Sequence, residues 1–298
     1  MLFTPTPQAI ANGDEKAIAR AISWVENQHP EAKKLLRQLT GNSPVIGITG
    51  PPGAGKSTLV NALATHYCKL NKRIAIVAVD PSSVFNFGSL LGDRLRMQSL
   101  YLMPNVFIRS LSSRGSLGGL SASILEVIDV LKHAQFDLII VETVGVGQSE
   151  VEIAGLADTT VVVSVPESGD EIQTLKSGIM EIADVFVVNK SDRAGADGFA
   201  SHLKKLAHIR SSAEWETPVV LTQASEHIGI QELASAIEKH SAYNVTNERK
   251  SHLLAERAYT LIQRQRMHDV QPKILQQDIE ARLKSGDFNL YDFIDEKI

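Results

Sequence analysis

The spacing of apolar residues divides the chain into three zones, of which the first is helical. Apolar positions recur at helical spacing over 15–26, as on one face of an amphipathic helix. Shorter helical patterns cover 8–10 and about 30–39, and the turn residues at 41–44 then end the zone. This part of the chain therefore predicts a set of short helices before the first strand.

Short apolar runs alternate with amphipathic helical patterns from residue 45 to about 240. Most of these runs are continuous stretches of β-branched residues, which are typical of parallel strands buried on both faces. The zone is therefore predicted to be an α/β domain with a mostly parallel central sheet flanked by helices, and its ligands are expected at the carboxyl ends of the strands. The predicted strands are 45–49, 74–80, 106–110, 138–142, 160–165, 185–189 and 219–222.

The last zone is helical and charged, with helices predicted at 247–268 and 272–284. A helical hairpin of this size needs a further surface against which to bury its apolar face. The sheet domain, the N-terminal helices and a second copy of the chain are all open as that surface. The predicted organisation is an N-terminal helical extension at 1–42, an α/β domain at 43–241 and a C-terminal helical segment at 242–298.

The composition of the chain limits which classes of partner and which cellular compartment are expected. The net charge of −4, from 30 basic and 34 acidic residues, gives no electrostatic case for nucleic acid or an anionic membrane. No apolar run approaches the roughly 20 residues of a membrane span. The N-terminus also lacks a signal-peptide pattern, so a cytoplasmic location is expected. The single cysteine, Cys68, falls in a helical pattern that favours a buried apolar role, with a reactive thiol as the alternative.

A glycine-rich loop between the first predicted strand and a helix predicts a phosphate site. Its spacing is that of a P-loop, in which backbone N–H groups and the positive end of the helix face phosphate oxygens. The lysine is expected to reach the β- and γ-phosphates, and the serine hydroxyl to bind Mg²⁺. The residues assigned to the nucleotide here are Gly50, Pro51, Pro52, Gly53, Ala54, Gly55, Lys56, Ser57 and Thr58.

Carboxylates at strand ends predict the remaining ligands of the metal. Glu142 ends a buried strand and opens Glu-Thr-Val-Gly, similar to the D-x-x-G segment of nucleotide hydrolases. Gly145 would then offer its backbone N–H to the γ-phosphate. Asp80 ends the second strand and Asp93 follows in the next loop, and Mg²⁺ prefers such oxygen ligands. The predicted metal set is Ser57, Asp80, Asp93 and Glu142, with a surface ion pair to Arg94 as the alternative for Asp93.

A second motif selects the base. Asn189-Lys190-Ser191-Asp192 follows a strand and matches N-K-x-D. A carboxylate at Asp192 accepts hydrogen bonds from the N1–H and the amine of guanine, whereas adenine would leave it unpaired. Asn189 is expected to brace the loop and the stem of Lys190 to cover the base. After the last strand, a backbone contact to the guanine oxygen is expected from Gln223, Ala224 and Ser225.

With these motifs the chain resembles the MeaB/ArgK/MMAA family of SIMIBI-class P-loop GTPases. The resemblance runs through 19–26, 47–58, 80–83, 91–94, 113–121, 141–150 and 279–286. It implies a P-loop NTPase fold, bound GTP or GDP with Mg²⁺, GTP hydrolysis, and homodimerisation through the C-terminal segment. It also implies a chaperone that gates cofactor loading and protects an adenosylcobalamin-dependent mutase of the methylmalonyl-CoA type. Segments 80–96, 145–150 and 113–121 resemble the family's three switches.

The chain departs from the family's usual pattern in the first of these switches. After residue 83 most relatives read P-F-[ST]-G-G, where this sequence carries Val84, Phe85, Asn86, Phe87 and Gly88. One proline and one glycine are therefore lost from this loop. Elsewhere, Ser116 and Glu167 replace a usual histidine and a usual glycine.

The expected reaction is transfer of the γ-phosphate to water, with Lys56 and Glu142 in the catalytic set. Gln148 is a candidate to position the water, with a structural role in its loop as the alternative, and Arg94, Arg96 and Arg114 are candidate charge stabilisers. A metal-inserting GTPase, a metabolite kinase of the old ArgK type and a GTP-dependent scaffold stay open as rivals. The single cysteine and scattered histidines argue against metal insertion, and Asp192 argues against an ATP-dependent kinase.

Overall fold

The computed structural model describes residues 3–80, 100–112, 123–143, 152–166, 177–210, 215–243, 255, 258–263, 265–286 and 288–297. The chain separates into two compact units, Met1–Thr246 and Asn247–Ile298. The first unit contains a large sheet with helices on both faces, and the described part of the second contains helices. Among the described helices, none is both long enough and apolar enough to cross a membrane.

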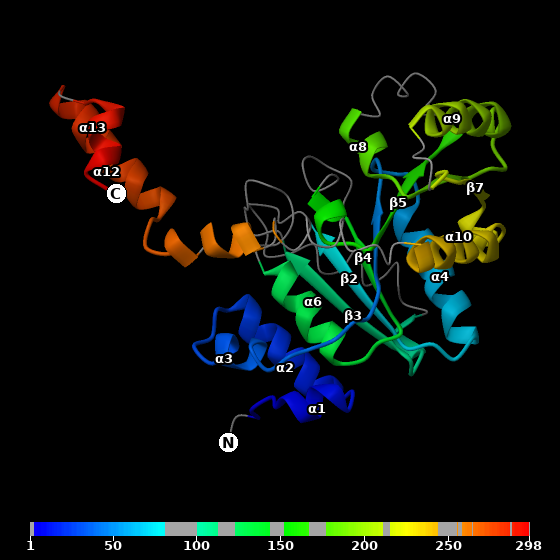
Figure 1. Ribbon diagram of the computed structural model, residues 1–298, viewed down its shortest axis with the longest axis horizontal. Coiled ribbons are helices and arrows are strands. Elements are labelled where there is room, and N and C mark those ends of the chain that lie inside the picture. The colour runs from blue at the N-terminus through cyan, green and yellow to red at the C-terminus, as the bar shows by residue number, and fades with distance from the viewer. Residues whose placement is uncertain are drawn as a thin grey trace. The chain divides into compact units, whose positions relative to one another are not determined.

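The sheet of the first unit has seven strands, and every pairing between neighbours is parallel. Its order is β3-β2-β4-β1-β5-β6-β7, so β1 lies in the middle between β4 and β5 (Figure 1). The prediction of an α/β fold with a parallel sheet is confirmed. The strands are β1 (Val45–Thr49), β2 (Ile74–Asp80), β3 (Val106–Ser112), β4 (Leu138–Glu142), β5 (Thr159–Ser164), β6 (Val185–Asn189) and β7 (Val219–Thr222).

Strands in the middle of the sheet are buried on both faces, as their continuous apolar sequences predict. In β1 all five residues are buried, and their side chains alternate between two separate cores. Ile46 and Ile48 belong to one core with helices α4 (Lys56–Lys69) and α10 (Ile230–Tyr243). Val45 belongs to the other, with α2 (Glu15–Glu26) and α6 (Ile124–His133). Beside β6, α9 (Ala196–Arg210) closes a third core.

The N-terminal helices pack on the sheet unit rather than standing apart from it. Asp14 caps α2 by accepting the N–H groups of Lys16 and Ala17. The buried face of α2 lies in the same core as α6, and an ion pair joins Glu26 to Arg109 of β3. The helix predicted at 30–39 is shorter than expected: α3 is Ala32–Leu36, and it buries only two side chains, which limits the packing that would support a longer helix. A five-residue helix, α1 (Pro7–Ala11), precedes them.

The C-terminal unit contains α12 (Pro272–Ser285) and α13 (Leu290–Asp295), and the second of these was not predicted. Asn289 caps α13 by accepting the N–H groups of Tyr291 and Asp292. Phe293 is the buried residue of α13, and the Arg282 guanidinium lies 5.2 Å from its ring centroid. Residues 258–263, within the helix predicted at 247–268, are helical. Many apolar side chains of this unit are exposed: Tyr259, Ile262, Met267, Ile274, Leu283, Leu290, Tyr291 and Ile294.

The remaining described elements are short. They are the helix α8 (Ser177–Ile182) and three 3-10 turns: η1 (Leu100–Leu102), η2 (Ile153–Gly155) and η4 (Ala224–Glu226).

Candidate nucleotide site

The carboxyl ends of β1, β4, β6 and β7 carry the residues that the sequence assigned to phosphate, metal and base. Because all strands are parallel, these ends lie along one edge of the sheet. The loop after β1 leads directly into α4, whose first residue is Lys56 (Figure 1). The first N–H groups of an α-helix have no partner within the helix and attract anions. This end of α4 is therefore an anion site by backbone geometry alone.

Two glycines of the loop after β1 occupy positions that no other residue would fit. Gly50 has a φ of 139°, and a Cβ there would lie 2.1 Å from the carbonyl oxygen of Val163 in β5. Gly55 has a φ of 87°, and its Cβ would lie 2.4 Å from Nδ2 of Asn189. The loop is thus fitted closely against β5 on one side and against the base-selecting motif on the other.

The Lys56 side chain folds back over the loop that precedes it. Its Nζ donates to the carbonyl oxygens of Gly50, at 2.8 Å, and Pro51, at 2.9 Å, and the residue is buried. A buried ammonium costs free energy unless polar partners surround it. These carbonyl contacts stabilise the curled loop and keep a positive charge inside it.

Ser57 and Glu142 meet at the position predicted for the metal. The Ser57 hydroxyl donates to Oε1 of Glu142 at 2.6 Å. Mg²⁺ takes oxygen ligands at about 2.0–2.1 Å in octahedral geometry, so that neighbouring ligands lie about 2.9 Å apart. A hydroxyl and a carboxylate oxygen at the observed spacing fit two adjacent positions of such a shell after a small adjustment. The donor set therefore suits a hard cation.

A contact that the sequence did not indicate joins Thr49 to Thr143, the residue that follows Glu142. The Thr143 hydroxyl donates to the Thr49 hydroxyl at 3.0 Å, and the Thr143 N–H donates to the Ile48 carbonyl at 3.0 Å. Both threonines are buried. They are the last residue of β1 and the first residue after β4, so this hydroxyl pair ties the start of the P-loop to the chain that leaves Glu142.

Asn189 joins the phosphate half of the site to the base half. Its Nδ2 donates to the Ala54 carbonyl at 2.9 Å, so it reaches the P-loop. Its Oδ1 accepts the Thr222 hydroxyl at 3.1 Å and the Ala224 N–H at 3.2 Å, so it also holds the loop after β7. The side chain is buried. The bracing role predicted for Asn189 thus has three described partners.

The lysine and the aspartate of this motif have different surroundings. Lys190 has a φ of 56°, which is uncommon outside glycine, and its Nζ donates to the Gly53 carbonyl at 2.8 Å. Its stem therefore spans from the base motif to the P-loop. Asp192 is exposed and forms no hydrogen bond or ion pair within the described part of the chain. Its carboxylate is thus available to a ligand.

The loop after β7 is held in a tight antiparallel closure. Gln223 and Ile228 exchange both backbone hydrogen bonds, at 3.1 and 3.2 Å. Gly229, with a φ of 74°, lies against the Leu221 carbonyl, and a Cβ there would approach that oxygen to 2.1 Å. The sequence placed Gln223, Ala224 and Ser225 at the base but gave no sign of Thr222 or Gly229. The Ala224 N–H is engaged by Asn189.

Several residues assigned from sequence lie outside the described residues. Asp80 ends β2 as predicted, but its side chain is not described. The other such positions are Asp93, Gly145, Gln148, Arg94, Arg96, Arg114, Val84, Phe85, Asn86, Phe87, Gly88, Ser116 and Glu167.

Comparison with known proteins identifies proteins of similar sequence and of similar structure. Residues 18–279 match the family model described as "Methylmalonyl Co-A mutase-associated GTPase MeaB". The Pyrococcus abyssi protein with the name "Putative GTPase PYRAB02490" is 43% identical over 288 residues, which cover 94% of this chain and 87% of that protein. GTPase ArgK of Escherichia coli is 39% identical over 240 residues, covering 76% of this chain and 72% of ArgK.

The fold also matches the crystal structure of a LAO/AO transport system kinase. The TM-score is 0.71 at 25% sequence identity, and the match covers 97% of this chain and 94% of that chain. The likeness extends over nearly the whole length of both proteins.

Proposed function

Because the chain belongs to the MeaB family of methylmalonyl-CoA mutase-associated GTPases, we propose that it binds GTP at the edge formed by β1, β4, β6 and β7 and hydrolyses it to GDP and phosphate. The observation that carries this proposal is a pair of hydrogen bonds from two consecutive residues of the base motif to two consecutive carbonyls of the P-loop. Asn189 bonds to Ala54 and Lys190 bonds to Gly53. The base motif and the P-loop are thus joined into one site by these two contacts.

Selection of guanine is assigned to Asp192. Its exposed carboxylate has no partner in the described part of the chain, so it can accept both donors of a guanine base. Adenine offers no such donor pair, and binding it would bury a charged group without partners. Asn189 positions this carboxylate indirectly, because it fixes the loop in which the carboxylate lies.

Ser57 and Glu142 are proposed to hold Mg²⁺ together with the β- and γ-phosphates. Bound Mg²⁺ would neutralise charge on those phosphates. Asp80 and Asp93 remain proposed ligands, direct or through water. The Lys56 ammonium, held by the loop carbonyls, is proposed to turn to the phosphate oxygens when GTP enters, since these are stronger acceptors for a cation. Phosphoryl transfer needs positioning and charge stabilisation, and this set supplies both.

The water that attacks the γ-phosphate is proposed to be oriented by Gln148, and Gly145 to contact that phosphate through its backbone N–H. Arg94, Arg96 or Arg114 would add positive charge if a partner brings one of them to the γ-phosphate. These roles rest on the motifs and on the family, and slow turnover by the isolated protein follows from them.

The biological role proposed for this GTPase is chaperoning of an adenosylcobalamin-dependent mutase of the methylmalonyl-CoA type. Support comes from the family, whose description links it to that mutase. A homodimer through the C-terminal unit is part of the same proposal, and the exposed apolar side chains of that unit, such as Tyr259 and Leu283, are consistent with it.

The test of nucleotide specificity is the substitution Asp192→Asn. An amide at this position would donate to the extra carbonyl of xanthine, and it keeps only one of the two acceptor oxygens that guanine needs. We expect the variant to lose GTP affinity at least tenfold and to gain affinity for XTP, measured with fluorescent nucleotide analogues. Unchanged GTP binding would refute the assignment of the base site.

The reaction and the partner need separate experiments. With γ-labelled GTP and candidate metabolites, label recovered only as inorganic phosphate supports hydrolysis, whereas a labelled metabolite would support a kinase. Pull-down with a non-hydrolysable GTP analogue or with GDP, using a purified methylmalonyl-CoA mutase, tests the chaperone role. A failure of that mutase to bind in either state would refute the proposed partner without affecting the GTP site.

A further inference from the structure

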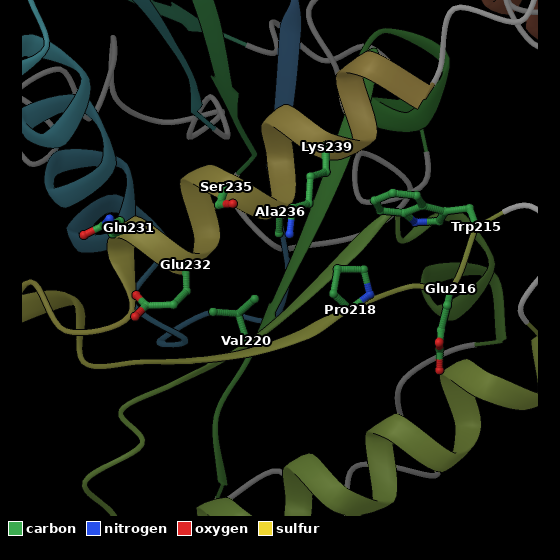
Figure 2. A pocket seen from close by; sticks show the side chains of 9 residues that line it. All are labelled: Trp215, Glu216, Pro218, Val220, Gln231, Glu232, Ser235, Ala236 and Lys239. Carbon is green, nitrogen blue, oxygen red and sulfur yellow. The ribbon is translucent and has the colours of Figure 1, made fainter.

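A groove of about 630 Å³ lies beside the edge strand β7, away from the P-loop and the base loop. One wall is the exposed side of α10, and the other is the segment from Trp215 to Val220 (Figure 2). Pro218 and Val220 give this second wall an apolar surface, and both are only half-buried. Its volume lies within the usual range of ligand sites, which is about 300–1,000 Å³.

The strand that forms this wall has an open edge. β7 is the last strand of the sheet, and no described strand pairs with its outer side. The Pro218 carbonyl accepts from Phe186 and the Thr222 carbonyl from Ser191, so these groups point toward β6. Backbone direction alternates along a paired strand, so the N–H and C=O of Val219 point outward. An unpaired edge of this kind can add an extended peptide as a further strand.

A rigid aromatic side chain stands at one end of the groove. The Trp215 indole N–H donates to the Asp184 carbonyl at 3.0 Å. Its ring lies edge-on to the buried His240, with centroids 4.8 Å apart, and stacks on Tyr243 at 5.7 Å. A half-exposed tryptophan that is already fixed loses little conformational entropy on binding. Anchors of this kind carry much of the energy of protein interfaces.

Two opposite charges flank the groove on the α10 side. Glu232 and Lys239 are seven residues apart, which is two helical turns, so they lie on one stripe roughly 10.5 Å apart along the axis. Neither makes an ion pair with any residue that the structure describes. Ser235 lies between them (Figure 2). The carboxylate of Glu216 lies 3.4 Å from His208 of α9 and points away from the groove.

We propose that this groove docks an extended peptide segment of a partner protein, added along the open edge of β7, with an acidic side chain at Lys239 and a basic side chain at Glu232. Side chains on one face of a strand are spaced by about 6.8 Å. A peptide that reads acid, x, apolar, x, base, or its reverse, therefore places an apolar group between the charges. This apolar group lies against Val220 and Pro218. The proposal is independent of GTP hydrolysis.

Tryptophan fluorescence provides the assay, because the chain has two tryptophans and Trp24→Phe leaves Trp215 as the single reporter. The probes are acetyl-Glu-Thr-Val-Thr-Lys-amide, its reverse acetyl-Lys-Thr-Val-Thr-Glu-amide, and acetyl-Thr-Glu-Val-Lys-Thr-amide. The third has the same residue types but puts its charges on the face opposite the valine. We expect one of the first two to bind at least tenfold tighter than the third.

Charge reversal separates the proposal from non-specific binding. Lys239→Glu is expected to weaken the preferred peptide at least tenfold, and Lys239→Glu combined with Glu232→Lys to reverse the preferred order of the two charges. Lys204→Glu on α9 is the matched control and should change neither the affinity for the preferred peptide nor the preferred order of charges. GTP affinity should stay unaltered in all variants. Equal binding of the three peptides, or a preference that the double variant does not reverse, would overturn the proposal. Thermal unfolding verifies that the exposed substitutions leave the fold intact.

Discussion

The structure predicts that Asn189→Ala destabilises the protein before any nucleotide is present. The amide makes three described hydrogen bonds, to Ala54, Thr222 and Ala224, and the exposed fractions of these residues are 0%, 0% and 4%. A buried polar group left without a partner costs about 1–3 kcal/mol. The Thr222 hydroxyl can rotate to another acceptor and the vacated space can admit water, so the three costs do not add fully. We expect a loss of about 2–4 kcal/mol in the free energy of unfolding.

Urea unfolding of the nucleotide-free protein measures this loss, and Asp192→Asn is the matched control. The Asp192 side chain is exposed and forms no hydrogen bond or ion pair within the described chain, so its substitution should change stability by less than about 0.5 kcal/mol. Both variants should lose GDP affinity, but only Asn189→Ala should also lose stability. If Asn189→Ala is as stable as the parent protein without nucleotide, the idea that this amide holds the two halves of the site together is wrong.

Three further outcomes are expected. Thr49→Val or Thr143→Val alone leaves one buried hydroxyl without its partner and should lower the free energy of unfolding by about 1–2 kcal/mol. The double variant should lose less than the sum of the two single losses, because neither hydroxyl is then left behind. Additive losses in urea unfolding would contradict this. Asp184→Ala removes a buried carboxylate that accepts from the Thr160 N–H and lies 3.3 Å from the His240 ring nitrogen, so buried polar groups lose a partner and a loss of about 2–4 kcal/mol is expected in the same assay. Burial raises the pKa of the Cys68 thiol, so its alkylation at pH 8 should be slower than that of a free thiol and should accelerate as pH rises; a rate equal to a free thiol would contradict the burial.

The sequence predicted the strands well because each carries its own local signal. β1, β4 and β6 are short β-branched runs that are buried throughout, and their bounds are the predicted ones. β3 continues two residues beyond the predicted end, to Ser112, and pairs with β2 as far as Asp80. Its extra length follows from this pairing with a neighbour, which a local pattern does not contain.

Short helices were less predictable for the same reason. α13 has six residues and buries Phe293, whose ring is contacted by the Arg282 guanidinium of the helix before it. Helices of this length are marginal in isolation, so tertiary contacts decide whether they form. Cys68 shows a related limit, because its helical position predicted burial and the side chain is only partly buried.

Within the site, motifs predicted which residues meet but not how they are held. Ser57 and Glu142 were assigned to one metal from their motifs alone, and they lie within hydrogen-bond distance. The hydroxyl pair of Thr49 and Thr143 depends on the register that sets Ile48 beside Glu142. That register joins residues far apart in sequence, so neither threonine carried a recognisable signal.

The contacts of the base motif imply that phosphate and base recognition are mechanically linked. Two consecutive residues, Asn189 and Lys190, bond to two consecutive P-loop carbonyls, those of Ala54 and Gly53. A displacement of the end of β6 would therefore move the loop that surrounds the phosphates. A base that displaces this motif would weaken the contacts to the phosphates as well as the contacts to the base. The guanine selectivity proposed for Asp192 should consequently affect the rate of the proposed phosphoryl transfer and not only nucleotide affinity, because Lys56 is held by the same loop.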